Sequence, residues 1–286
     1  MEVGADALPD DDTRDYWSSL HLDALSLVFT KLDLFDILMG AGLVCHSWLD
    51  AAKVPSLWRG VDMVDQGLVL EKLRSGESDV LCAMAKLAVD RSCGQLQEFH
   101  GKRFVTAELL NYIGDRAPSL KTLRLRHCYL GSEEFTEAIK KFPLLEELEM
   151  FCSYESGFLG HRTVYELIAK ACPHLKSFKH LHGYTVIYGG LYSEQEGKSI
   201  AMADDGALGI ATMTGLRTLQ LLHEDISNKG LTAILKGCPH LDSLDIRQCS
   251  HVKMDAAMKA RLASIKSLRL PSEPMDDYLQ ELLQMP

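Results

Sequence analysis

The sequence has fewer basic residues than acidic ones and no cluster of Lys and Arg. Its 286 residues include 30 Lys and Arg against 40 Asp and Glu, which gives a formal net charge of -10 at pH 7. Because contacts to nucleic-acid phosphates need clustered positive charge, we expect no nucleic-acid partner. The same acidic balance makes an anionic membrane surface a poor partner.

Long apolar runs are also missing. No stretch approaches the roughly 18 apolar residues that a membrane-spanning helix needs. The start, MEVGADALPDDDTRD, is acidic where a signal peptide would be basic and then apolar. We therefore expect an intracellular protein, in the nucleus, the cytoplasm or both, with no membrane partner. Residues 1–14 hold almost no large apolar side chain, which predicts a disordered acidic tail.

The motifs of common catalytic and metal sites are absent as well. The sequence has no phosphate loop, no G-x-S-x-G and no H-E-x-x-H. Cys45 and His46 are adjacent, and on a helix such neighbours point about 100° apart, so they do not form a nucleophile and its base. CPH occurs at 172–174 and 238–240 without any paired C-x-x-C. We predict no catalytic residue, no metal and no cofactor.

The chain does have enough apolar material for a sizeable core. Apolar residues make up 47% of it, and its length allows one elongated domain or two compact ones. Eight cysteines are spread along the chain without dense pairing, which is typical of reduced thiols that serve as small buried hydrophobes.

Residues 17–63 show helical spacing of their apolar side chains. The predicted buried stripe of a first helix consists of Leu22, Leu25, Val28, Phe29 and Leu32. Asp33 is expected to cap a second helix, a third runs through Trp48, and Pro55 begins a final turn. A unit this small seldom stabilises its own core, so we expect it to bury an apolar face against another molecule. A plain helical subdomain that packs its apolar residues inward is the alternative.

Seven segments after residue 93 share the template L-x-x-L-x-L. Their leading residues are Leu96, Leu120, Leu145, Leu175, Leu216, Leu241 and Ile265, at intervals of 24, 25, 30, 41, 25 and 24 residues. These intervals centre on the leucine-rich repeat, with a period of about 20–29 residues. Cys128, Cys152 and Cys249 occupy its Asn/Cys position. Each repeat forms a short parallel strand on the concave side and a returning helix on the convex side. The expected outer helices are 133–141, 162–171, 204–212 and 228–236.

Three further segments complete the predicted organisation. Residues 64–92 are predicted to form a helical linker between the N-terminal helices and repeats that span residues 93–271. Residues 180–199 interrupt the template, and Tyr184, Tyr188 and Tyr192 there are either anchors for a partner or aromatics folded onto the repeats. Residues 272–286 form a cap of the last repeat or a free recognition tail. The predicted fold class is α/β.

The N-terminal segment resembles the F-box, a helical motif that docks on a Skp-family adaptor. His21 stands where most F-boxes have proline, and the spacing from Leu32 to Cys45 is one residue longer than the commonest pattern. The adaptor-binding residues that the resemblance implies are Leu20, His21, Leu25, Val28, Leu32, Ile37, Leu38, Leu43, Val44, Cys45, Trp48, Leu57 and Trp58.

An F-box followed by cysteine-containing leucine-rich repeats resembles the plant F-box/leucine-rich-repeat proteins of the Skp-interacting type. The resemblance implies a non-catalytic substrate receptor of an SCF ubiquitin ligase, with a Skp-family adaptor, a cullin–RING complex and a protein target as partners. A scaffold with a degenerate F-box is the main alternative. Recognition gated by a small molecule is a second one.

Strand alternation indicates which residues face the concave side, where a target would bind. The candidates are Arg124, Arg126, Glu149, Phe151, Lys179, Gln220, Asp245 and Arg247, with Tyr188 from the 180–199 stretch. A solvated sheet face without a partner is the alternative interpretation.

Overall fold

A single parallel sheet runs the length of the molecule, in a computed structural model that describes residues 20–64, 77–128, 130–152, 161–182 and 196–276. Its eight strands follow one another in chain order. They are β1 Gly60–Met63, β2 Glu98–Lys102, β3 Thr122–Arg126, β4 Glu147–Cys152, β5 Ser177–His182, β6 Thr218–Leu222, β7 Ser243–Asp245 and β8 Ser267–Arg269. The predicted acidic tail 1–14 lies outside the described residues.

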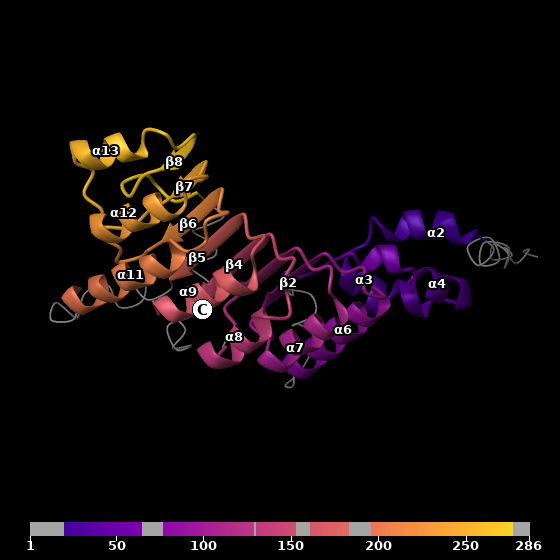
Figure 1. The fold of residues 1–286 in the computed structure, drawn as a ribbon. Coiled ribbons are helices and arrows are strands. Elements are labelled where there is room, and N and C mark those ends of the chain that lie inside the picture. Colours follow the sequence, from indigo (N-terminus) through magenta and orange to yellow (C-terminus); the bar gives the residue numbers. More distant parts are fainter. Residues whose placement is uncertain (1–19, 65–76, 129, 153–160, 183–195, 277–286) are drawn as a thin grey trace, which may run out of the picture.

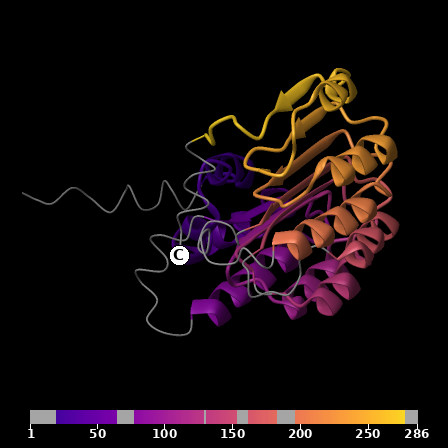
Figure 2. The ribbon, with the colours of Figure 1, turned by 90° about the vertical axis from the view of Figure 1, so that its left-hand side faces the viewer.

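The described outer helices lie on one face of this sheet (Figure 2). The opposite face, which these helices do not cover, is called the open side. The outer helices are α6 Glu77–Arg91, α7 Ala107–Arg116, α8 Ser132–Ile139, α9 Arg162–Ala171, α11 Glu196–Ile210, α12 Asn228–Gly237 and α13 Ala256–Leu262. The predictions for α8, α9 and α12 are confirmed. The predicted helix 204–212 is wrong at its start, because α11 begins at Glu196, within the stretch expected to be a loop.

The N-terminal helices stand at one end of the array (Figure 1). They are α2 Leu22–Phe29, α3 Leu34–Met39, the 3-10 turn η1 Ala41–Leu43, α4 His46–Ala51 and the 3-10 turn η2 Pro55–Trp58. Asp33 caps α3 as predicted, accepting a hydrogen bond from the Asp36 amide at 2.7 Å. The predicted buried stripe of the first helix is wrong in part, because only Leu25 and Phe29 are buried in α2.

Trp58 joins these helices to the sheet. It is 1% exposed, and its indole N–H donates to the Ala52 carbonyl at 2.9 Å. Trp58, Val61 and Met63 repeat the L-x-x-L-x-L spacing with different residues, so the first repeat begins at Trp58. The sheet therefore starts at β1, more than 30 residues before the predicted boundary at residue 93.

The predicted linker 64–92 is also assigned differently by the structure. Its described part forms α6, which packs against α7 and β1 as the first helix of the outer layer. This repeat was not predicted from the sequence because Trp, Val and Met replace the usual leucines at its core positions.

The core consists of strand side chains that point toward the helices. Residues of neighbouring strands pair in register, so that equivalent apolar positions form continuous rows. One row contains Leu123, Leu148, Phe178, Leu219 and Leu244, all buried. A second contains Leu125, Met150, His180 and Leu221. The alternate residues consequently face the open side, which we call the concave face.

Asp204 of α11 fixes the start of α12. Its Oδ1 accepts from the amides of Ser227 at 2.9 Å and Gly230 at 3.1 Å, while its Oδ2 accepts from the Ser227 hydroxyl at 2.7 Å. A Cβ at Gly230 would lie 2.4 Å from Asp204 Oδ1, so this approach needs glycine. Asp204 thus satisfies amides at a helix start that would otherwise lack acceptors.

We predict that Asp204→Ala lowers the stability of the repeats by about 1 to 3 kcal/mol, because buried donors lose their acceptor. Thermal unfolding followed by circular dichroism measures this change. Asp205→Ala is the control, since that neighbouring side chain is exposed, and it should change the free energy of unfolding by no more than about 0.5 kcal/mol. Equal melting temperatures for the two variants would contradict the capping role.

Candidate functional site

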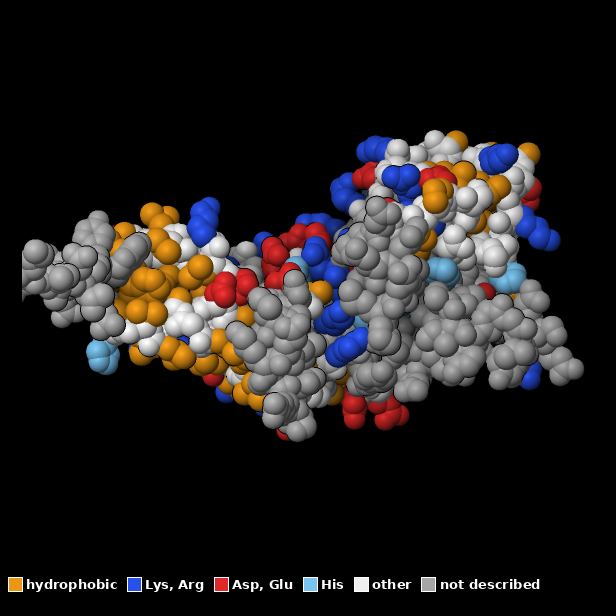
Figure 3. All heavy atoms as spheres, turned by 180° about the vertical axis from the view of Figure 1, so that it is seen from behind, with side chains coloured by type: hydrophobic (Ala, Val, Ile, Leu, Met, Phe, Trp, Pro, Cys, Tyr) orange, Lys and Arg blue, Asp and Glu red, His pale blue; other side chains and the backbone are white. Residues whose placement is uncertain are grey.

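The N-terminal helices carry a patch of exposed apolar side chains. Figure 3 shows apolar side chains gathered at this end of the molecule. Leu43 is 74% exposed, Leu27 69% and Val44 61%. The N-terminal apolar patch is defined by Leu22, Leu27, Val28, Met39, Leu43 and Val44. Contiguous exposed apolar surface of this kind is typical of a site that another protein covers.

The residues expected to bind an adaptor divide into three groups. His21, Val28, Leu43 and Val44 are exposed; Leu20, Leu32, Leu38, Cys45, Trp48 and Leu57 are half-buried; Leu25, Ile37 and Trp58 are buried in the core. The buried three cannot form the contact surface and instead hold the helices that carry it. Sequence reasoning missed Leu22, Leu27 and Met39 as surface residues. The exposure of Leu27 could have been predicted, because helical spacing puts it on a different face of α2 from Leu25 and Phe29.

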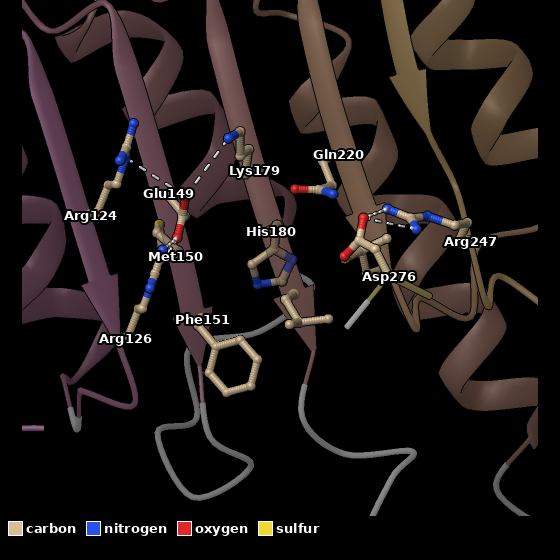
Figure 4. Close-up of a pocket in the computed structure, with 12 residues that line it drawn as sticks. Arg124, Arg126, Glu149, Met150, Phe151, Lys179, His180, Gln220, Arg247 and Asp276 are labelled. Carbon is tan, nitrogen blue, oxygen red and sulfur yellow. Dashed lines mark hydrogen bonds and ion pairs between the residues drawn. The ribbon is translucent and has the colours of Figure 1, made fainter. Parts of the chain in front are cut away.

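A cavity of about 260 Å³ opens on the concave face (Figure 4). We call it the concave pocket. Its lining comes from β3 to β6, the residues after β7 and the segment after β8. The lining residues are Arg124, Arg126, Glu149, Met150, Phe151, Lys179, His180, Leu181, Gln220, Leu222, Arg247 and Asp276.

Most of the concave residues proposed from the sequence meet in this pocket. Seven of the nine line it, namely Arg124, Arg126, Glu149, Phe151, Lys179, Gln220 and Arg247. Asp245 lies beside them and accepts a hydrogen bond from Gln220 Nε2 at 2.8 Å. Tyr188 lies outside the described residues. The structure brings these side chains together, and their role in target binding stays a prediction.

Glu149 is the centre of a charge cluster at one end of the pocket. Its Oε1 lies 2.8 Å from Arg126 Nη2, and its Oε2 lies 3.8 Å from both Arg124 Nε and Lys179 Nζ. Neighbouring strands supply the cations, because Arg124, Glu149 and Lys179 are direct register partners. One carboxylate therefore stands among three cations on a partly buried surface.

Arg247 occupies the other end and is 4% exposed. Its Nη2 donates to Asp245 Oδ2 at 2.7 Å, and its Nη1 donates to the Pro274 carbonyl at 3.1 Å. The hydrogen bond with Asp245 raises the pKa of Arg247 above its ordinary value, with help from Asp276. Asp276 Oδ2 lies 3.4 Å from the guanidinium. The segment after β8 thus returns onto the concave face.

An apolar floor separates the two charged ends. Phe151, Leu181 and Leu222 form a small buried cluster of their own, and Met275 packs against it. Phe151 was expected to face the concave side, and the structure shows it covered there, with the His127 ring 4.1 Å away. Sequence reasoning missed Leu181 and Leu222, although alternation signals both, since each follows a core position in its strand. No local sequence pattern predicts that Met275 and Asp276 lie at the pocket.

His180 departs from the repeat template. It stands at a core leucine position and is 1% exposed. Its Nδ1 lies 2.7 Å from Glu224 Oε1 and 3.3 Å from the Tyr165 hydroxyl. A polar contact thus replaces an apolar one at a core position that also lines the pocket.

Four described cysteines of the repeats are buried, namely Cys128, Cys172, Cys238 and Cys249, which indicates a structural role. Burial raises the pKa of Cys128 to about 12, of Cys172 to about 12 and of Cys238 to about 11, and it also raises the pKa of Cys249. The thiols of Cys128 and Cys249 contact the carbonyls of Arg126 and Leu221, each at 3.3 Å. The side chain of Cys152 lies outside the described residues. Within the described ranges, no group of three or more His, Cys, Asp and Glu side chains is placed to hold a metal.

The F-box domain model matches residues 17–60. Over 266 residues the chain is 37% identical to Putative F-box/LRR-repeat protein 22 of Arabidopsis thaliana, covering 92% of this chain and 79% of that protein. It is 34% identical to F-box protein SKIP19 of the same plant over 265 residues, covering 91% and 79%. The chain belongs to the plant F-box/leucine-rich-repeat family.

A third relative and one solved structure are also similar to this F-box/leucine-rich-repeat protein. Putative F-box/LRR-repeat protein 9 of Arabidopsis thaliana is 34% identical over 242 residues, covering 83% of this chain and 89% of that protein. The structure titled Crystal structure of Rad7 and Elc1 complex in yeast matches with a TM-score of 0.38 and 12% identity, covering 95% of this chain and 67% of that one. Among the described helices, none is long and apolar enough to cross a membrane.

The buried thiols give a prediction for alkylation of the folded F-box/leucine-rich-repeat protein. Iodoacetamide at pH 8 should modify the exposed Cys93 and spare Cys128, Cys172, Cys238 and Cys249, because alkylation needs an accessible thiolate. Unfolding in urea should make all four reactive. Peptide mass spectrometry assigns each site. Rapid native modification of any of the four would contradict their structural role.

Glu149 gives a second prediction. Glu149→Gln should lower the free energy of unfolding by about 1 to 3 kcal/mol, because three neighbouring cations lose the carboxylate that balances them. Glu147→Gln is a matched control two residues away on the same face, where the side chain is 48% exposed, and it should cost no more than about 1 kcal/mol. Thermal melts of both variants measure the difference. If the Glu149→Gln and Glu147→Gln variants have equal melting temperatures, the charge cluster contributes little to stability.

Proposed function

We propose that this protein is the substrate-recognition subunit of an SCF-type ubiquitin ligase. In this role the F-box helices dock on a Skp-family adaptor, which links them to a cullin–RING complex, while the concave face holds a target protein. The observation that carries the proposal is the N-terminal apolar patch, which lies on the F-box helices and away from the repeats. We place this activity in the nucleus or the cytoplasm.

The packing beneath the patch supports adaptor docking. Leu25, Phe29 and Ile37 are buried between the F-box helices, and the Trp48 ring packs edge-on against Phe29 at 5.5 Å. These contacts fix α2, α3 and η1 so that their remaining apolar side chains face outward together. An apolar surface that is already ordered loses little conformational entropy when a partner covers it, which favours binding.

The departures from the F-box pattern are accommodated locally. His21, at the usual proline position, is the N-cap of α2, and its ring accepts from the Asp23 amide at 3.4 Å. The longer spacing between Leu32 and Cys45 includes the turn at η1, where a Cβ on Gly42 would lie 2.8 Å from the Ile37 carbonyl oxygen. Both features favour a working F-box over the degenerate one of the scaffold alternative.

The proposed role requires no bond chemistry from this chain. A receptor that holds a target near a ubiquitin-charged enzyme raises the effective concentration of the reacting groups. The chain contributes two binding surfaces at separate places on one rigid body. Catalytic residues would then belong to other subunits.

We predict that Val44→Asp weakens binding to a purified Skp-family adaptor at least about tenfold, because burying an unpaired carboxylate opposes the burial of apolar surface. Leu43→Asp should have a similar effect. Isothermal titration calorimetry of the full chain measures both. Neither substitution should change the melting temperature much, since both side chains are exposed.

The control for this test is Val80→Asp, which changes an exposed apolar side chain on α6, outside the F-box. It should bind the adaptor as the unmodified protein does. If the well-folded unmodified chain fails to bind any Skp-family adaptor, the ligase role is wrong and the scaffold alternative replaces it.

A further inference from the structure

The concave pocket is occupied in part by the chain itself. Residues 274–276 contribute three kinds of contact to it: a backbone carbonyl, an apolar side chain and a carboxylate. Pro274 accepts from Arg247, Met275 packs on the Phe151 cluster, and Asp276 pairs with Arg247. Figure 4 shows Asp276 beside Arg247 at the edge of the pocket. The segment has no helix or strand structure at these residues.

The pocket has a charge opposite to that of the whole chain. Four cationic side chains line it, whereas the lining carboxylates are Glu149 and Asp276. The full chain has a net charge of -10. Asp276 belongs to the occupying segment, so the pocket without that segment has a still larger positive excess. Such a surface attracts carboxylates and repels cations.

The chemistry of the pocket lining favours the side chains of a peptide. The pocket keeps a volume of about 260 Å³ with Asp276 of the occupying segment in its lining. An apolar floor beside a cationic wall suits two neighbouring residues of a peptide, one apolar and one acidic. Met275 and Asp276 show this arrangement within the chain itself.

We infer that the concave pocket binds an acidic, irregular segment of a partner protein in which an apolar residue directly precedes Asp or Glu. The chain's residues 274–276 occupy the same place and compete with that segment. The apolar side chain rests on Phe151, Leu181 and Leu222, and the carboxylate pairs with Arg247, while Lys179 at the other end adds to the positive potential that attracts the acidic segment. The inference rests on the proposed function only in taking the segment to be part of a ubiquitination target.

The test uses a fluorescein-labelled peptide, SEPMDD, which copies residues 272–277 of the chain. Its binding to the full-length protein is followed by fluorescence anisotropy. The double variant Met275→Ala/Asp276→Asn should bind the peptide at least about fivefold more tightly than the unmodified protein, because a tethered competitor acts at an effective concentration near the millimolar range. Equal affinity for the two proteins would overturn the competition.

Changes in the peptide make the test independent of folding. SEPMNN removes the two aspartate charges and keeps the glutamate, SEPGDD removes the apolar side chain, and each should bind the double variant roughly tenfold more weakly than SEPMDD. Adding Lys179→Gln to the double variant should weaken SEPMDD to a similar degree. Arg261→Gln, which changes an exposed residue of α13, is the matched control and should not weaken it. If neither peptide change weakens binding to the double variant, the proposed recognition is wrong.

Adaptor binding by the same proteins separates this inference from the proposed function. The double variant should bind a Skp-family adaptor as the unmodified chain does, because the changed residues are remote from the N-terminal apolar patch. Peptide binding without adaptor binding would support the pocket and reject the ligase role. Adaptor binding without selective peptide binding would reject the pocket's recognition and leave the ligase role in place.

Discussion

The shared core around Trp58 is the constraint on which the arrangement of this molecule depends. The indole is the last large buried side chain of the F-box and also the leading residue of the first repeat. Arg91 of α6 lies over its ring at 5.2 Å, so the first outer helix is attached at the same point. Because apolar contacts continue from the F-box into the sheet, the two parts form one body. The N-terminal apolar patch and the concave pocket are consequently supported by one continuous core.

Much of this fold could be predicted because the repeat template states both the period and the face of each side chain. Leu120, Leu123 and Leu125 fix one strand, and the same spacing fixes the others by repetition. The first repeat escaped prediction because its core positions hold Trp58, Val61 and Met63 and because the F-box motif already accounted for the tryptophan. The start of α11 was missed because irregular sequence precedes it. In both cases the residues had been assigned to another feature, the F-box for Trp58 and the 180–199 stretch for the start of α11.

The candidate site was predictable to the extent that it depends on strand alternation. Arg124, Glu149, Lys179 and Gln220 lie side by side because each is one residue beyond a core position of its strand. Burial of the neighbouring row, which contains Phe151, Leu181 and Leu222, was not predictable, since Met275 from the segment after β8 packs against it. The packing of Met275 against this cluster joins residues far apart in the sequence, and no periodic pattern indicates it. Interactions of this kind require the three-dimensional arrangement.

The return of the last segment onto earlier strands has a consequence for the order of folding during synthesis. Chains emerge from the ribosome N-terminus first, at about 5–20 residues per second, and repeat arrays can grow by adding each unit to the one before. The F-box closes the starting end of the sheet, so each new strand adds to an existing edge. Every strand that contacts Met275 and Asp276 precedes them in the chain. A nascent chain can therefore form the strands of the pocket before residues 274–276 emerge and cover part of it.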